Sequence, residues 1–196
     1  MDRQVRSNYK VMLTDFFNSR ELVHNEYAPQ GQKINKEYYR DVLRRLRDAV
    51  RRKREDLWSS GNWRLHYDNA PAHSSHLIKN FWQKKQTPVL QQAPYSPDMA
   101  PCDFWLFHKI KRPLKGTRFQ TREDIMAAST AELNSIPKEA FSACFHQWRN
   151  RWEKSVNSQG NYFEGDKVSN APSKPVYFSR PKVGYFSNRT RICRDV

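Results

Sequence analysis

Two aspartates, Asp68 and Asp103, stand where a solvated acid is unusual, because each adjoins a run of apolar residues. Asp68 closes the run WRLHYD, Asp103 stands near the start of the run CDFWLF, and 34 residues separate the two acids. If Asp68 lies at the carboxyl end of a strand and Asp103 in the first turn of a helix, one edge of a sheet brings them together. Two carboxylates in such a place form a binding site for a hard divalent cation.

Each aspartate taken alone also has a structural interpretation. Asp68 fits a turn residue at the end of a strand, and Asp103 fits a helix cap or a first-turn acid. The motifs DNAP and YSPDMAPCD that surround them favour the metal-binding interpretation. A zinc site is disfavoured, because no common zinc motif has the spacing of the available ligands His66, His73, His76 and Cys102.

Hydrophobic patterning predicts the elements that position these acids. Two short runs, Tyr9 to Phe17 and Glu21 to Ala28, predict a hairpin. Apolar residues at helical spacing predict a helix of about 24 residues from the N-cap Asn35 to Trp58. Further strands are expected over residues 63–68 and 87–93, and further helices over residues 74–85, from about residue 102, over 122–135 and over 138–156. This order indicates a mixed α/β (α+β) domain.

The composition favours an anionic partner. Among 196 residues, 35 Lys and Arg oppose 20 Asp and Glu, for a formal net charge of +15. Such a field attracts polyanions, and nucleic acid is the first partner to test. One face of the predicted 35–58 helix is basic, and its candidate DNA-contact residues are Arg44, Arg45, Arg47, Arg51, Arg52, Lys53 and Arg54. The alternative is a solvated surface, and the run RRKR also has the composition of a nuclear localisation signal.

Several protein classes are disfavoured by the same sequence. No window approaches 18 consecutive apolar residues and the first ten residues lack the apolar core of a signal peptide, so we expect an intracellular, soluble chain with no membrane partner. Three widely spaced cysteines argue against a disulfide framework. The chain has only six glycines and no glycine-rich phosphate loop, and we expect no small-molecule substrate.

Four segments carry a resemblance to a known family. They read HYDNAPAH, APYSPDMAPCDFWLF, RFQTREDIMAA and RWEKSVNSQGNYFEGD. With the basic helix segment they resemble the catalytic domain of mariner-type transposases, of the Tc1/mariner superfamily, over residues 10–166. The interval between Asp68 and Asp103 is the one that this family keeps between its second and third catalytic acids. The transposase-derived half of a SET-domain methyltransferase fusion protein is also similar, but has Asn where this chain keeps Asp103.

The resemblance implies a ribonuclease-H-like fold and cut-and-paste DNA transposition. In the family, three aspartates hold two Mg²⁺ or Mn²⁺ ions, one activating the attacking water or 3′-hydroxyl and the other stabilising the leaving oxygen. Asp68 and Asp103 match the second and third of these acids, as catalytic residues and as metal ligands. The resemblance also implies transposon terminal inverted repeats as the DNA partner, a homodimer, and a nuclear location.

The match departs from the family pattern at its start. The family's first acid lies on the first strand of the fold, between the strands that correspond here to KVMLTDFF and WRLHYD, and no such strand precedes Lys10. We therefore expect a short extension over residues 1–9, an N-terminally truncated catalytic domain over 10–166, and a basic, disordered tail over 167–196. The expected consequences are open sheet edges, marginal stability and an incomplete two-metal site, with Asp15 as a candidate surrogate acid.

Three functional hypotheses follow from the resemblance and the departure. The first is a transposase catalytic domain that cleaves and transfers DNA strands with the help of metal ions. The second is a catalytically dead, transposase-derived module for nucleic-acid binding or dimerisation. The third is a product with no stable fold. Metal-dependent nicking of supercoiled DNA separates the first two.

Overall fold

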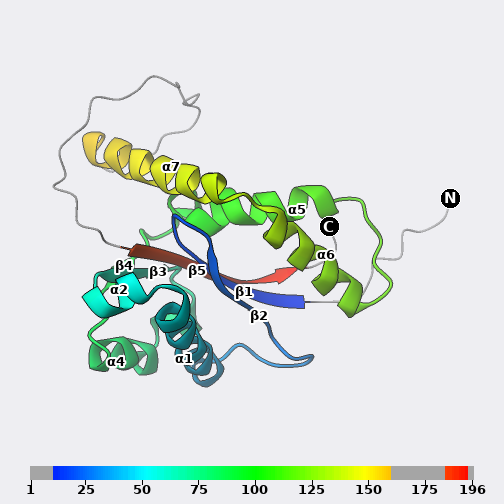
Figure 1. The fold of residues 1–196 in the computed structure, drawn as a ribbon, viewed down its shortest axis with the longest axis horizontal. Coiled ribbons are helices and arrows are strands. Elements are labelled where there is room, and N and C mark those ends of the chain that lie inside the picture. Colours follow the sequence, from blue (N-terminus) through cyan, green and yellow to red (C-terminus); the bar gives the residue numbers. More distant parts are fainter. Residues whose placement is uncertain (1–10, 160–183, 194–196) are drawn as a thin grey trace.

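In the described part of the chain, a five-stranded sheet lies between two layers of helices (Figure 1). The structure is a computed structural model that describes residues 11–159 and the backbone of residues 184–193. The strands are β1 (Val11–Phe17), β2 (Leu22–Tyr27), β3 (Trp63–Tyr67), β4 (Val89–Gln91) and β5 (Gly184–Cys193). Their order across the sheet is β2-β1-β5-β3-β4. The expected mixed α/β architecture is confirmed.

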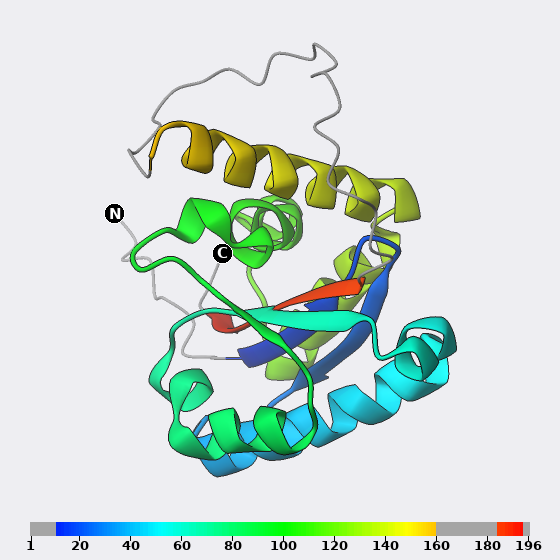
Figure 2. The same cartoon turned by 90° about the vertical axis from the view of Figure 1, so that its left-hand side faces the viewer.

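The helices divide between the two faces of the sheet (Figures 1 and 2). One face carries α1 (Lys36–Lys53), α2 (Glu55–Ser60), α3 (Pro71–Ser74) and α4 (His76–Lys84). The other face carries α5 (Phe107–Leu114), α6 (Arg122–Ser135) and α7 (Lys138–Asn157). Each layer buries its own apolar cluster against the sheet, with Leu46 and Leu65 at the centre of the first and Leu13 and Phe107 at the centre of the second. No described helix is long and apolar enough to cross a membrane.

The hairpin and the long helix confirm the patterning argument, with one difference. Asn35 caps α1 by accepting a 2.9 Å hydrogen bond from the Tyr38 amide, and the apolar positions of the helix are buried. The helix ends at Lys53 rather than at Trp58, because Arg54 leaves the helical conformation with φ −138° and ψ 57°. The Arg54 guanidinium instead lies 2.6 Å from Glu21 at the end of the hairpin turn. A tertiary ion pair therefore divides one predicted helix into α1 and α2.

The later elements follow the predicted order with shifted ends. The helix predicted over residues 74–85 is two helices, α3 and α4, because Ser75 is extended with ψ 153°. The strand predicted over residues 87–93 shortens to β4. α6 begins with the capping box formed by Thr121 and Asp124, and α7 spans nearly the predicted length.

β5 contradicts two predictions. Residues 184–193 form a strand rather than part of a disordered tail, while residues 1–9, 167–183 and 194–196 lie outside the described residues. β5 pairs antiparallel with β1 and parallel with β3. It therefore occupies the position that the family's first strand was expected to leave open. The predicted unpaired edges between β1 and β3 are absent from the described sheet, because β5 supplies their hydrogen-bonding partner.

Candidate metal and nucleic-acid site

Asp68 directly follows β3 and organises the turn after it. Its Oδ1 accepts a 3.1 Å hydrogen bond from the Ala70 amide and lies 2.6 Å from Nδ1 of His73. His73 is buried, and its ring stacks on Tyr39 of α1 at a centroid distance of 3.9 Å. The carboxylate is thus held at the strand end by a local turn and by a buried imidazole. Sequence reasoning missed the roles of His73 and Tyr39, although His73 lies within the HYDNAPAH motif.

Asp103 lies in a π-helical turn, Cys102–Leu106, that leads into α5. Its amide donates a 2.8 Å hydrogen bond to the Ala100 carbonyl, and the residue is 9% exposed. Pro101 precedes the turn as its N-cap, so Asp103 is a first-turn acid rather than the cap. Single π-helical turns of this kind are rare and often accompany functional sites. The geometry around Asp103 therefore fits a functional carboxylate as well as a structural one.

Side-chain contacts join the segment after Asp68 to the loop before Asp103. Asn69 donates a 3.0 Å hydrogen bond to the Gln92 carbonyl, and the Gln92 side chain donates one of 2.6 Å to the Ser96 carbonyl. The DNAP turn and the SPDMAP loop are therefore linked through residue 92.

Helix α7 makes a second link between the same segments. Trp148 donates a 2.7 Å hydrogen bond to the Met99 carbonyl, and its ring lies 5.0 Å from the ring of His66 on β3. Arg151 donates to the Asp98 carbonyl and stacks over Phe104. Burial lowers the pKa of His66 to about 4, partly offset by the charge of Asp68, so this imidazole is neutral at pH 7 and packs as an aromatic ring.

The carboxylates of Asp68 and Asp103 fit a hard divalent cation in donor type, but two acids do not complete a two-ion centre. Carboxylate oxygens are the ligands that Mg²⁺ and Mn²⁺ prefer. No group of three His, Cys, Asp or Glu residues able to hold a metal occurs among the described residues. A third carboxylate that could join Asp68 and Asp103 is therefore not found among the described residues.

The strand in the position of the family's first strand brings no acid to this edge. Asn188 of β5 is in register with Tyr67, the last residue of β3, and Arg189 is in register with Asp15 of β1. Residues 184–193 contain neither Asp nor Glu. β5 therefore restores the hydrogen bonding of the sheet without restoring a carboxylate.

Asp15 is wholly buried in β1, on the face that also carries Leu13 and Phe17. Neither carboxylate oxygen has a hydrogen-bond partner among the described residues, and burial raises the pKa of Asp15 to about 8. The group is therefore protonated at pH 7, and a neutral, inaccessible acid is a poor ligand for a divalent ion. The surrogate role stays a prediction that this environment disfavours.

The predicted basic face is only partly available for DNA. Arg47 donates a hydrogen bond to Thr87 and lies over the Trp58 ring, and Arg54 is 11% exposed in its pair with Glu21. The other predicted contacts are exposed. These exposed residues are Arg44, Arg45, Arg51, Arg52 and Lys53. Some of them pair with acids, as Arg44 does with Asp41.

Comparisons with known proteins agree with this architecture. A family model described as "Transposase (partial DDE domain)" matches residues 1–60. The mariner Mos1 transposase of Drosophila mauritiana is 29% identical over 163 residues, which cover 83% of this chain and 47% of that protein. The histone-lysine N-methyltransferase SETMAR of Homo sapiens is 26% identical over 155 residues, covering 79% of this chain and 23% of that protein. The chain thus spans about half the length of the first relative and about a quarter of the second.

Solved structures extend the agreement to three dimensions. A structure of the Mos1 transposase catalytic domain with Raltegravir and Mg has a TM-score of 0.74 at 29% identity, covering 82% of this chain and 81% of that one. A Mos1 paired-end complex with Mn has a TM-score of 0.76 at 29% identity, covering 84% of this chain and 48% of that one. The fold is ribonuclease-H-like, as the strand order and the helical layers indicated. The chain is a relative of the mariner-type transposases, and the resemblance of its motifs to their catalytic domain is confirmed.

Proposed function

We propose that this chain is a mariner-type transposase catalytic domain that binds DNA and in which Asp68 and Asp103 bind a divalent cation, Mg²⁺ or Mn²⁺. The observation that carries the proposal is the pair of links, through Gln92 and through Trp148, that join the segments of these two acids at one end of the sheet. A cation bound there supplies Lewis-acid activation of phosphodiester chemistry. The residues of the chain hold the carboxylates, with His73 orienting Asp68.

DNA is the proposed partner, because the chain carries a net charge of +15 and exposes basic residues along α1. The Mos1 relatives have been solved in paired-end and strand-transfer complexes, which supports the same partner and a homodimer for this chain. A nuclear location is part of the proposal and follows from a DNA substrate.

A second candidate function, a catalytically inactive DNA-binding or dimerisation module, is favoured by β5. This strand lies where the family carries its first acid, and it contains no carboxylate. Two acids alone do not hold two ions in register. We therefore expect the chain by itself to bind DNA and a divalent ion without cleaving DNA.

Mn²⁺ binding and nicking of supercoiled plasmid distinguish these functions. Asp68→Asn and Asp103→Asn should each weaken Mn²⁺ binding at least tenfold in titration calorimetry, because each removes one anionic ligand. Asp98→Asn, in the short turn Pro97–Met99 before Asp103, is the matched control and should leave Mn²⁺ binding unchanged. Absence of Mn²⁺ binding by the unmodified chain would overturn the metal site.

The nicking assay then decides between the two functions. No Mn²⁺-dependent nicking is expected from the chain or its variants. Robust nicking that both substitutions abolish would show that a further ligand completes the site, and would establish the active enzyme. Asp15→Asn tests the surrogate directly, because only a ligand role would make it weaken Mn²⁺ binding.

A further inference from the structure

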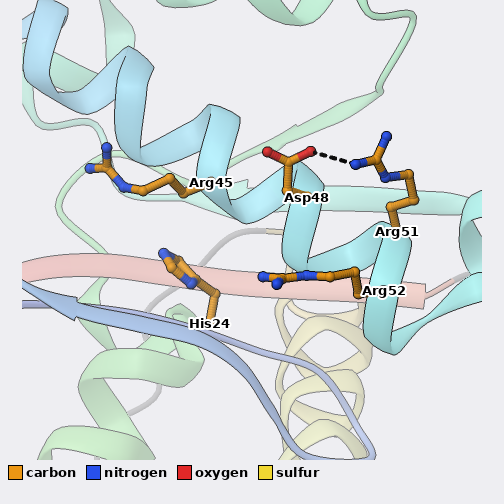
Figure 3. A pocket seen from close by; sticks show the side chains of 5 residues that line it. All are labelled: His24, Arg45, Asp48, Arg51 and Arg52. Atoms are coloured by element: carbon orange, nitrogen blue, oxygen red, sulfur yellow. Dashed lines mark ion pairs between the residues drawn. The ribbon is translucent and has the colours of Figure 1, made fainter.

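A basic hollow lies between the edge strand β2 and the C-terminal half of α1 (Figure 3). Its volume is about 350 Å³, and its lining residues are His24, Arg45, Asp48, Arg51 and Arg52. Its lining on α1 runs from Arg45 to Arg52, about 9 to about 20 Å along the helix from Tyr39, the residue that stacks on His73. None of the lining residues is among those that hold Asp68 or Asp103, so the hollow is separate from the candidate metal site.

His24 lies on the α1 side of the sheet because it pairs with Phe16, which packs in the core on that side. Phe16 pairs with His24 and Phe17 pairs with Leu22, so Val23 is an extra residue on β2. Val23 packs in the α1-side core, and the His24 ring lies 6.1 Å from the ring of Phe16 in the same core. The bulge therefore places Val23 beside His24 on the α1 side of β2.

Glu26 fixes two of the lining residues. Arg45 donates two hydrogen bonds of 2.7 Å to its carboxylate, and His24 Nε2 lies 2.9 Å from Oε2. Burial alone would raise the pKa of Glu26, but these hydrogen bonds lower it to about 2. The carboxylate therefore stays charged, and the positions of Arg45 and His24 are set before any ligand arrives.

Positive charge exceeds negative charge in the hollow. Arg51 lies 3.3 Å from Asp48, but both side chains are 61% exposed, and such ion pairs contribute little in water. Arg52 extends toward His24 in Figure 3 and pairs with no carboxylate within the described part of the chain. Cations in the last turn complement the helix dipole, but that role does not explain why His24 and Arg45 face the same hollow.

We propose that this hollow binds one phosphate group of a DNA backbone, an inference that rests on the proposed DNA-binding function. Guanidinium groups offer paired N–H donors that match phosphate oxygens. A backbone phosphate is favoured over a small free anion for two reasons. The hollow continues into the exposed basic end of α1, where Lys53 follows Arg52, and the net charge of +15 attracts a polyanion.

The test compares two double substitutions that remove the same charge from opposite faces of the sheet. Arg51→Gln with Arg52→Gln empties the hollow of two cations, and Arg112→Gln with Arg118→Gln is the matched control from exposed positions near α5. Fluorescence anisotropy with a duplex of about 20 base pairs gives the slope of log affinity against log salt. Circular dichroism checks that both variants fold.

The hollow variant should reduce the magnitude of that slope by about 0.9, the contribution of one neutralised phosphate, while the control leaves it unchanged. Equal reductions in both variants, or none in either, would overturn the proposal while leaving DNA binding by the chain intact. Absence of DNA binding by the unmodified chain would overturn the proposed function as well.

Two further measurements sharpen the test. Asp48→Asn removes the acid from the hollow and should raise DNA affinity at low salt by several-fold; no gain would count against the site.

Binding of inorganic phosphate distinguishes a free anion from a DNA phosphate as the ligand of the hollow. If inorganic phosphate binds the unmodified chain and not the hollow variant, while the salt slope for DNA stays the same in both, the site takes free phosphate and the DNA assignment is wrong.

Discussion

Asp15 is an acid buried in β1 with no hydrogen-bond donor among the described residues, and its protonation couples folding to pH. Its pKa is about 8 in the folded chain against 3.8 for an ordinary aspartate, so the folded state holds one more proton between these values. The contribution of this residue to stability is present below pH 3.8 and is lost as pH rises through about 8. The loss amounts to about 1.4 kcal/mol per pH unit within that window.

Asp15→Asn should remove this dependence. The variant and the unmodified chain should have similar free energies of unfolding near pH 4, and the variant should be more stable at pH 8. Urea denaturation at several pH values measures the difference. Asp41→Asn, at an exposed position on α1, is the control and should keep the slope of the unmodified chain. Parallel pH profiles for Asp15→Asn and the unmodified chain would show that this carboxyl is not protonated by burial.

Glu26 makes folding stability depend on pH in the opposite direction to Asp15. Burial opposes ionisation, but hydrogen bonds from Arg45 and His24 lower the pKa of Glu26 from 4.5 to about 2, so its stabilising effect is complete above pH 4.5 and is lost as pH falls toward 2. Glu26→Gln should therefore lower the free energy of unfolding at pH 7 by about 1 to 2 kcal/mol, and by less at pH 3. Denaturation at both pH values measures the effect. Glu37→Gln, whose partner Lys36 is 3.9 Å away, should change little. A Glu26→Gln effect no larger than that control would contradict the role of the buried pair.

At the scale of elements, β5 closes the sheet between β1 and β3. Its backbone pairs with both neighbours, so removing it leaves two rows of unpaired amide and carbonyl groups. Deletion of residues 184–196 should lower the free energy of unfolding by several kcal/mol, since each unmade buried hydrogen bond costs about 1 to 3 kcal/mol. Thermal unfolding and light scattering measure the loss of stability and the resulting aggregation.

A synthetic peptide of residues 184–193 should restore stability to the deleted chain when added in excess. The same peptide with Ser187→Pro is the control, because proline cannot donate in a central strand and Ser187 is in register with both Phe17 and His66. If deletion leaves stability unchanged, β5 does not hold the sheet together.

At the scale of the whole molecule, the charge of +15 predicts a DNA affinity that depends on salt more than on sequence. Four phosphate contacts would lower the affinity about 100-fold between 50 and 200 mM salt. Anisotropy titrations with two duplexes of unrelated sequence measure both dependences. The two duplexes should bind alike at each salt concentration. An affinity that is indifferent to salt would contradict electrostatic binding.

The sequence by itself determined the local elements and the identity of the two acids. Apolar spacing located α1, β3 and α7, and the side chains of Asn35 and Thr121 identified helix starts, because these signals act within one helical turn. The motifs around Asp68 and Asp103 identified the family that the comparisons then confirmed. These are properties of neighbouring residues, which a sequence displays directly.

The tertiary structure decided what depends on residues far apart in the chain. The ion pair between Arg54 and Glu21 ends α1 before the predicted end of the helix. The packing of Arg47 on Trp58 makes Arg47, a predicted DNA contact, less available to DNA. The pairing of β5 with β1 joins residues 170 to 182 positions apart, and it makes residues 184–193 of the predicted disordered tail a central strand. Such pairings depend on which backbone amide and carbonyl groups of a folded sheet lack a hydrogen-bond partner. Those unpaired groups exist only once the other strands are in place.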